Sequence, residues 1–134
     1  MDLKKQYTDF IKSKSLDLGF MSCGISKSGF LSSEADRFEN WLKNNYHGEM
    51  SYMERNFDKR LDTKKLVEDS KSVISLTYNY YPKRLLTESN SFKISKYAYG
   101  KDYHLVLKKK LKELLNIMKT KFGHFEGRVF VDSA

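Results

Sequence analysis

Cysteine is nearly absent from this sequence, because Cys23 is the one cysteine among 134 residues. A lone thiol excludes an internal disulfide and any metal or cluster site built from several cysteines of this chain. Cys23 stands in the stretch "FMSCGI", where a free cysteine is typically a small buried hydrophobe. We therefore assign Cys23 no catalytic role.

Long apolar runs are absent as well. No stretch approaches the ~18 consecutive apolar residues of a membrane-spanning helix. The first residues, "MDLKKQYTDF", contain no apolar core of a secretory signal. We expect a protein that stays in the cytoplasm and has no membrane partner.

The glycine-rich loops and nucleophile motifs of common enzymes are missing. The sequence contains neither G-x-x-x-x-G-K-[ST] nor G-x-G-x-x-G, which argues against nucleotide folds of those types. It has no G-x-S-x-G elbow, which argues against classical serine hydrolases. His47, His104 and His124 share no metal-ligand spacing, so no metal site is expected, and His47 and His124 are expected on the surface.

The composition that remains is that of a folded protein. Hydrophobic residues make up 40% and charged residues 31% of the chain, which predicts one domain over residues 1–134 with a core of its own. The formal net charge is +8, which favours a polyanionic partner such as nucleic acid. Lysine-rich solvated helix faces produce the same total without any partner, so charge alone leaves both interpretations open.

The periodicity of the apolar residues predicts a mixture of helices and strands. Helices are expected over residues 2–18, 34–45 and 102–122, with a short one near 50–56; Ser33 and Asp36 imitate a capping box before the second. Strands are expected over residues 20–25, 71–81, 92–99 and 127–132. This order indicates an α+β fold with helices packed on a mixed or antiparallel sheet. Because the chain stops just after an apolar strand, we expect it to be part of a longer protein.

Two acidic residues stand where predicted strands end. Asp102 follows "YAYGK" and Asp132 closes "VFVD", and ligands of layered sheets collect at such ends. A carboxylic acid in an apolar pocket can donate a proton near neutral pH. The alternative for Asp102 is that it merely caps the following helix. Six tyrosines surround the same strand ends and predict either a floor for a planar ligand or ordinary core packing: Tyr78, Tyr80, Tyr81, Tyr97, Tyr99 and Tyr103.

Three segments give the chain a specific resemblance to a known family. They are "YHGEMSYMERNFDKRLDTKKLVEDSKSVISLTYNYYP", "ISKYAYGKDYHLVLKKKLKEL" and "GRVFVDSA". In order and spacing they resemble the N-terminal domain of epoxyqueuosine reductase, over essentially the whole chain. The resemblance implies a nitroreductase-like, cobalamin-binding sandwich that reduces the epoxide of epoxyqueuosine in tRNA to the alkene of queuosine. The oligomeric state stays open, with a monomer expected.

The resemblance also implies roles for particular residues. Asp132 of "VDSA" matches the family's proton donor beside cobalamin. Arg60 of "DKR" and Ser95 of "ISKY" match positions that contact cobalamin. Asp102 and Tyr103 fall in a segment that lines the substrate pocket.

One departure from the family pattern concerns electron delivery. The resemblance implies two [4Fe–4S] clusters, each of which needs four cysteine thiolates, and this chain has a single cysteine. The clusters therefore belong to a C-terminal part outside this sequence, and this piece alone is expected to be inactive. Two alternatives remain, namely a basic RNA-binding module without catalysis and a flavin-dependent reductase domain.

Overall fold

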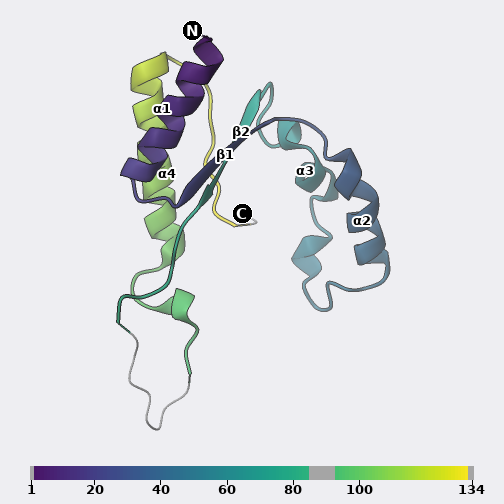
Figure 1. Ribbon diagram of the computed structural model, residues 1–134. Helices are drawn as coiled ribbons and strands as arrows, with labels where there is room; N and C mark the ends of the chain where they lie inside the picture. The colour runs from purple at the N-terminus through teal and green to yellow at the C-terminus, as the bar shows by residue number, and fades with distance from the viewer. Residues whose placement is uncertain (1, 85–92, 133–134) are drawn as a thin grey trace. The chain divides into compact units, whose positions relative to one another are not determined.

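The computed structural model of the chain describes residues 2–84 and 93–132. Over these residues helices and strands alternate irregularly along the chain (Figure 1). The α-helices are α1 (Leu3–Asp17), α2 (Ser32–Lys43), α3 (Phe57–Leu61) and α4 (Tyr103–Phe122), the strands are β1 (Ser22–Lys27) and β2 (Ser72–Thr77), and the short 3-10 helices are η1 (Ser51–Met53), η2 (Thr63–Lys65) and η3 (Lys96–Ala98).

The two strands form an antiparallel pair. The N–H of Met21 donates to the carbonyl of Thr77 at 2.8 Å, and the N–H of Ser28 donates to the carbonyl of Lys71 at 3.0 Å. Residue numbers therefore rise along one strand as they fall along the other. The α+β class with an antiparallel sheet is thus confirmed for the described residues.

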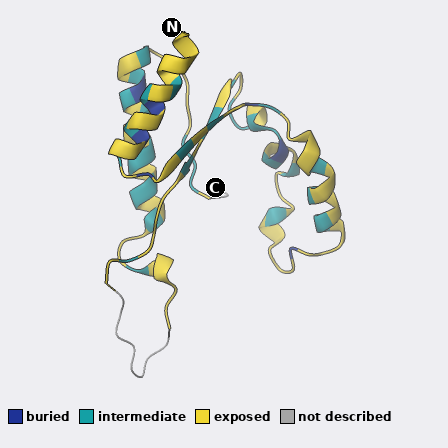
Figure 2. Cartoon of the chain, in the orientation of Figure 1, coloured by how far each residue is buried: buried dark blue, intermediate teal, exposed yellow. Residues whose placement is uncertain are grey.

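The chain divides into two compact units, one formed by Met1–Gly24 with Ser75–Ala134 and the other by Ile25–Ile74. In the first unit α1 packs against α4, and the segments coloured as buried lie where the two helices face each other (Figure 2). The apolar residues least exposed to solvent there are Ile11, Phe20, Leu114 and Met118. Burial of such side chains contributes about 1.5 to 3 kcal/mol each.

Polar side chains and glycine cap the ends of α1 and α4, and of these caps Asp102 was predicted from sequence. Asp2 accepts a hydrogen bond from the N–H of Lys4, and Asp102 accepts one from the N–H of His104. Gly19 adopts a positive φ of 87° just beyond α1, a conformation that glycine adopts without strain. Lys110 from α4 donates to the carbonyl of Leu18 at 2.7 Å. Its positive charge therefore lies at the C-terminal end of α1, where the helix dipole is negative.

The second unit is built around an aromatic stack and a buried hydroxyl. The rings of Phe38 and Phe57 stack with centroids 5.3 Å apart, which joins α2 to α3. The hydroxyl of Ser28 pairs with those of Thr63 and Ser70. Because Ser28 is buried, these bonds satisfy a polar group that would otherwise cost stability.

Three local predictions are wrong. The capping box does not form, because Leu31 is the N-cap residue of α2 and the Ser33 hydroxyl bonds to Glu34 instead. Residues 93–99 form no strand but contain the 3-10 helix η3, and residue 92 lies outside the described residues. Residues 127–132 form no strand either.

The failure at 127–132 has a physical reason. An apolar alternation becomes a strand only if a neighbouring strand accepts its backbone hydrogen bonds, and in the described chain β1 and β2 pair only with each other. The segment instead runs back along α4. Gly127 lies so close to Leu115 that a Cβ there would approach a Leu115 methyl group to 2.8 Å.

Candidate active site

The first turn of α4 holds two of the polar residues predicted from sequence. Asp102 Oδ1 accepts a hydrogen bond from the backbone N–H of His104 at 2.9 Å and pairs with its Nδ1 at 3.0 Å. These bonds lower the pKa of Asp102, with the backbone N–H of His104 as the main cause. Asp102 therefore does cap the helix, as its alternative interpretation predicted.

The returning segment brings Asp132 to the same turn. Tyr103 donates its hydroxyl proton to Asp132 Oδ2 at 2.5 Å, and His104 Nε2 lies 3.3 Å from the same oxygen. Asp132 has a φ of 56°, in the left-handed region that aspartate and asparagine tolerate better than most residues. Residues separated by almost thirty positions thus meet in one cluster, here called the α4 acid cluster and made of Asp102, Tyr103, His104 and Asp132.

Hydrogen bonding raises the pKa of Tyr103 to about 12, and the carboxylate of Asp132 is the first cause. Loss of the phenolic proton would remove the hydrogen bond and place a phenolate beside a carboxylate. Tyr103 is therefore a neutral donor at physiological pH. It holds one oxygen of Asp132 and leaves the other for a second partner.

Asp132 differs from expectation in two respects. It follows a segment without regular structure rather than a rigid strand end, and its side chain is 58% exposed. Within the described residues it does not lie in an apolar pocket. The described surroundings of Asp132 therefore lack the apolar enclosure that the sequence-based prediction assumed.

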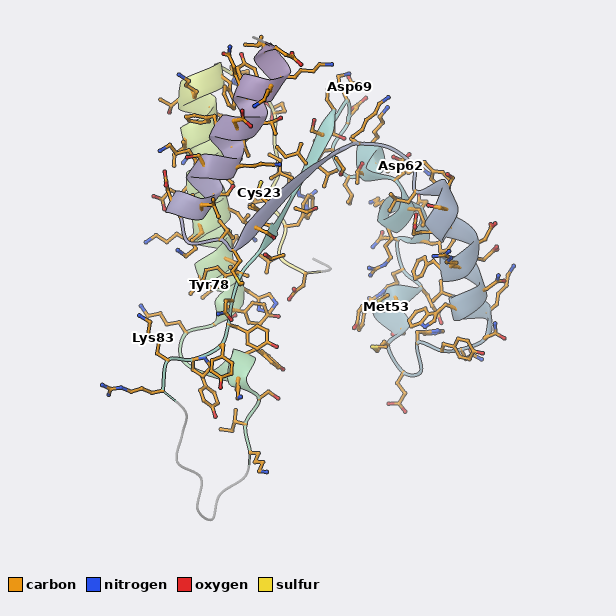
Figure 3. The ribbon with its side chains drawn as sticks, in the orientation of Figure 1. Cys23, Met53, Asp62, Asp69, Tyr78 and Lys83 are labelled. Atoms are coloured by element: carbon orange, nitrogen blue, oxygen red, sulfur yellow. The ribbon has the colours of Figure 1, made fainter. Side chains whose placement is uncertain are left out.

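A row of exposed aromatic rings continues from the cluster. Tyr103 stacks on His104 at 4.1 Å, Tyr97 contacts Tyr103 edge to face at 6.0 Å, and Tyr80 contacts Tyr97 in the same way at 6.5 Å. Figure 3 shows aromatic side chains gathered beyond the end of β2, near the label of Tyr78. Tyr80 and Tyr97 are both more than half exposed. An open aromatic surface of this kind is suited to a broad planar ligand.

Ser95 and Arg60 lie outside the α4 acid cluster. Ser95 is exposed and precedes η3, where its carbonyl accepts the N–H of Ala98 at 2.9 Å. Arg60 belongs to the second unit and donates to the carbonyls of Arg55 and Tyr52 at 3.1 and 2.9 Å. Two of its five guanidinium N–H donors thus bind carbonyls of the preceding turn, and the other three could bind a ligand.

His47 is buried, so its predicted surface position is wrong. It is 4% exposed, its Nε2 lies 2.6 Å from Glu54, and its ring packs 5.6 Å from that of Trp41. The turn after α2 folds back over Trp41, which the sequence pattern does not reveal. His124 is exposed, as predicted. Among the described residues no group of three or more His, Cys, Asp or Glu side chains could hold a metal ion.

His104 is a member of this region that was not predicted from sequence as a site residue. His104 lies within ion-pair distance of both carboxylates of the cluster. The spacing Asp-x-His at a helix start could have identified the contact with Asp102, since an N-cap carboxylate faces the residue two positions on. No feature of the sequence predicted the contact between His104 and Asp132.

Comparisons with known proteins agree on one family. A family model described as "Epoxyqueuosine reductase QueG, DUF1730" matches residues 60–133. The chain is 57% identical over 134 residues to an epoxyqueuosine reductase of Cellulophaga algicola and 55% identical over 135 residues to one of Cyclobacterium marinum. All of this chain is covered in both alignments but only 44% of each relative. The chain thus spans less than half the length of these relatives.

Solved structures give the same fold. The structure of an epoxyqueuosine reductase from Bacillus subtilis, described with a catalytic aspartate loop swung out of the active site, matches with a TM-score of 0.74 and 24% identity. It covers 89% of this chain and 33% of the other. An epoxyqueuosine reductase bound to an epoxyqueuosine-modified tRNA stem loop matches with a TM-score of 0.75 and 24% identity, covering 87% and 32% of the two chains. No helix in the described ranges is long and apolar enough to cross a membrane.

Proposed function

Because the chain belongs to the epoxyqueuosine reductase family, we propose that it forms the N-terminal, catalytic part of an enzyme that reduces epoxyqueuosine in tRNA to queuosine. The observation that carries the proposal is the pairing of Asp132 with Tyr103 beside the exposed aromatic row. It combines a held carboxyl group with exposed aromatic rings that a planar cofactor could contact. The proposal includes action in the cytoplasm, on tRNA, by a monomer with a nitroreductase-like sandwich around the cofactor.

Cobalamin is the cofactor that these residues fit best. Its corrin is broad and flat and carries amide side chains, which suit exposed tyrosine faces together with hydroxyl and guanidinium donors. Tyr80 and Tyr97 would contact the ring, and Ser95 would bind a polar group of the cofactor. For Arg60, which belongs to the second unit, the family resemblance alone supports a contact with cobalamin. Bound cobalamin would supply the low-valent metal chemistry for opening a C–O bond, which no side chain provides.

Iron–sulfur clusters do not fit the residues of this chain. A [4Fe–4S] cluster needs four thiolates, and the sequence contains Cys23 alone. The clusters would lie in the remaining part of the longer protein. Electron delivery is therefore assigned to residues outside this sequence.

Asp132 would act as the proton donor. In its protonated form it would transfer a proton to the epoxide oxygen as the first C–O bond opens, so that a neutral hydroxyl group rather than an alkoxide forms on the neighbouring carbon. Completing the reduction to the alkene takes two electrons from outside this chain and a second proton from solvent, and releases that oxygen as water. Tyr103 would orient the carboxyl group through its hydroxyl, since its raised pKa keeps that hydroxyl protonated. Asp102 and Tyr103 would line the space that the modified base enters.

A titration of the purified chain with cob(II)alamin tests the cofactor assignment. We expect saturable binding with the visible spectrum of the base-off form, in which the cofactor's own lower ligand is released. Binding of flavin with a yellow protein would instead support the flavin-dependent alternative. Salt-dependent RNA binding without any corrin affinity would support the non-catalytic RNA-binding alternative and contradict the proposal.

A further inference from the structure

One face of α4 carries an unusual set of lysines. A shallow, open groove on this helix is lined by Leu105, Lys108, Lys109, Lys112, Glu113 and Asn116. Their spacing places them on a single side of the helix, opposite the buried residues Leu114 and Met118. Lys108, Lys109 and Lys112 are exposed and are here called the α4 lysine face.

These lysines differ from several others in the chain because they lack acidic partners. Lys5, Lys43 and Lys65 each form an ion pair with a carboxylate, at 2.6, 2.9 and 3.1 Å. Within residues 2–84 and 93–132, no carboxylate lies within 4.0 Å of the amino groups of the α4 lysine face. Glu113 is nearby, but Lys followed by Glu four residues later is the weaker orientation of such a pair.

The α4 lysine face begins next to the α4 acid cluster. His104, whose Nε2 lies 3.3 Å from Asp132, immediately precedes Leu105, the first residue of the groove. Lys108 and Lys112 are separated by four residues, which is about 6 Å along a helix at 1.5 Å per residue. Positive charge therefore extends along α4 from the residues assigned to the chemistry.

We propose that the α4 lysine face binds the sugar–phosphate backbone of the RNA that carries the reacting nucleotide. The inference rests on the proposed function, because it takes the modified base to lie at Asp132. Lysine is a point charge that binds phosphate without base specificity, and phosphate contacts of this kind position a nucleic acid. An open groove accommodates a continuous polymer, whereas a small anion would be held by an enclosed set of donors.

The test measures RNA affinity over a series of salt concentrations with fluorescence anisotropy, using an anticodon stem-loop hairpin as the probe. The variant is Lys108→Gln with Lys109→Gln and Lys112→Gln. The matched control is Lys5→Gln with Lys43→Gln and Lys65→Gln, which lowers the net charge equally but at ion-paired positions. All six lysines have exposed side chains outside the cores, so both variants are expected to fold.

We expect the α4 variant to lower the slope of log K against log salt by about 2 to 3, since each phosphate contact contributes roughly 0.7 to 0.9. Affinity at low salt should fall on the order of 10-fold to 100-fold, and the control should change much less. Replacing the same three residues by arginine should preserve the slope, because the charge is kept.

Three outcomes would overturn the inference. They are equal losses in both triple variants, an unchanged slope in the α4 variant, or no RNA binding by the chain at all. A parallel cobalamin titration separates this failure from that of the proposed function. If the chain binds cobalamin but the α4 substitutions do not change RNA binding, the inference about the α4 lysine face is wrong and the proposed function still stands.

Discussion

Tyr103 and Asp132 form the contact on which the proposed chemistry depends, and each restrains the other. The phenol donates to the carboxylate, and the carboxylate raises the pKa of the phenol to about 12. A raised pKa means that the contact stabilises the folded state below pH 10, the usual pKa of tyrosine, and that this contribution is lost as pH rises through about 12. The pair is therefore intact throughout the physiological range.

Spectrophotometric titration of the tyrosines provides the first prediction. The difference between the titration curves of the wild-type chain and Tyr103→Phe should show one phenol with a midpoint near 12. In an Asp132→Asn background the same difference should move toward 10, because the charge that opposes ionisation is gone. A midpoint near 10 in both backgrounds would show that the two side chains do not interact in solution.

Asp132→Asn provides the second prediction, which is measured on an active full-length enzyme that contains these residues. Asparagine tolerates the φ of 56° and still accepts from Tyr103, but its amide does not act as a general acid. Turnover should fall by a factor of about 10² to 10⁴, the usual contribution of general acid catalysis, while cobalamin binding is retained. Turnover close to wild type would exclude Asp132 as the proton donor.

Arg60→Ala is the third prediction. Because two guanidinium donors already bind the carbonyls of Tyr52 and Arg55, the substitution should loosen the turn before α3 and also remove donors for the cofactor. We expect the loss of binding free energy for cobalamin to exceed the loss of free energy of unfolding. The first is obtained from the dissociation constant and the second from urea denaturation. Arg55→Ala is the control, since its backbone carbonyl remains. An unchanged dissociation constant would leave Arg60 with a structural role alone.

Among the helices and strands, α4 performs two tasks with two faces. Its inner face packs on α1 through Leu114 and Met118, and its first turn presents the α4 acid cluster. Lys110 ties it to the end of α1. The position of Tyr103 therefore depends on the packing of a helix whose buried residues lie further along its length.

A pair of identical substitutions on α4 tests this packing and is the fourth prediction. Leu114 is 3% exposed and Leu105 is 70% exposed. Leu114→Ala should lower the free energy of unfolding by about 2 to 5 kcal/mol, because it leaves a cavity in the core. Leu105→Ala should change it by less than about 0.5 kcal/mol. Urea denaturation followed by circular dichroism measures both, and similar effects at the two positions would contradict the assigned packing.

In the proposed function, the chain as a whole contributes the proton donor, and electron delivery is assigned to residues outside this sequence. A single cysteine cannot hold a cluster. The fifth prediction is that this chain, loaded with cobalamin and given modified tRNA, converts no epoxyqueuosine under conditions in which a full-length epoxyqueuosine reductase is active. Mass spectrometry of the digested tRNA measures the conversion. Product formation by the chain alone would contradict the assignment of electron transfer to residues outside this sequence.

Features with local signals could be predicted from the amino-acid sequence. The apolar spacing predicted both α1 and α4 to within a few residues, and Asp102 could be predicted as a cap of α4 because an N-cap side chain acts on neighbouring backbone groups. The centres of β1 and β2 were also predicted, since their alternation reflects burial of one side. The sequence also indicated Asp102, Tyr103 and Asp132 as site residues, with the family resemblance supplying their roles.

Features that depend on contacts between distant residues became visible only in the folded chain. Segments 93–99 and 127–132 have the composition of strands, yet the described chain offers them no partner for pairing. The meeting of Asp132 with Tyr103 and His104, and the burial of His47 against Trp41, arise from how the chain folds back on itself. Periodicity records which side of an element is apolar, but it does not record which distant side chain will lie against it.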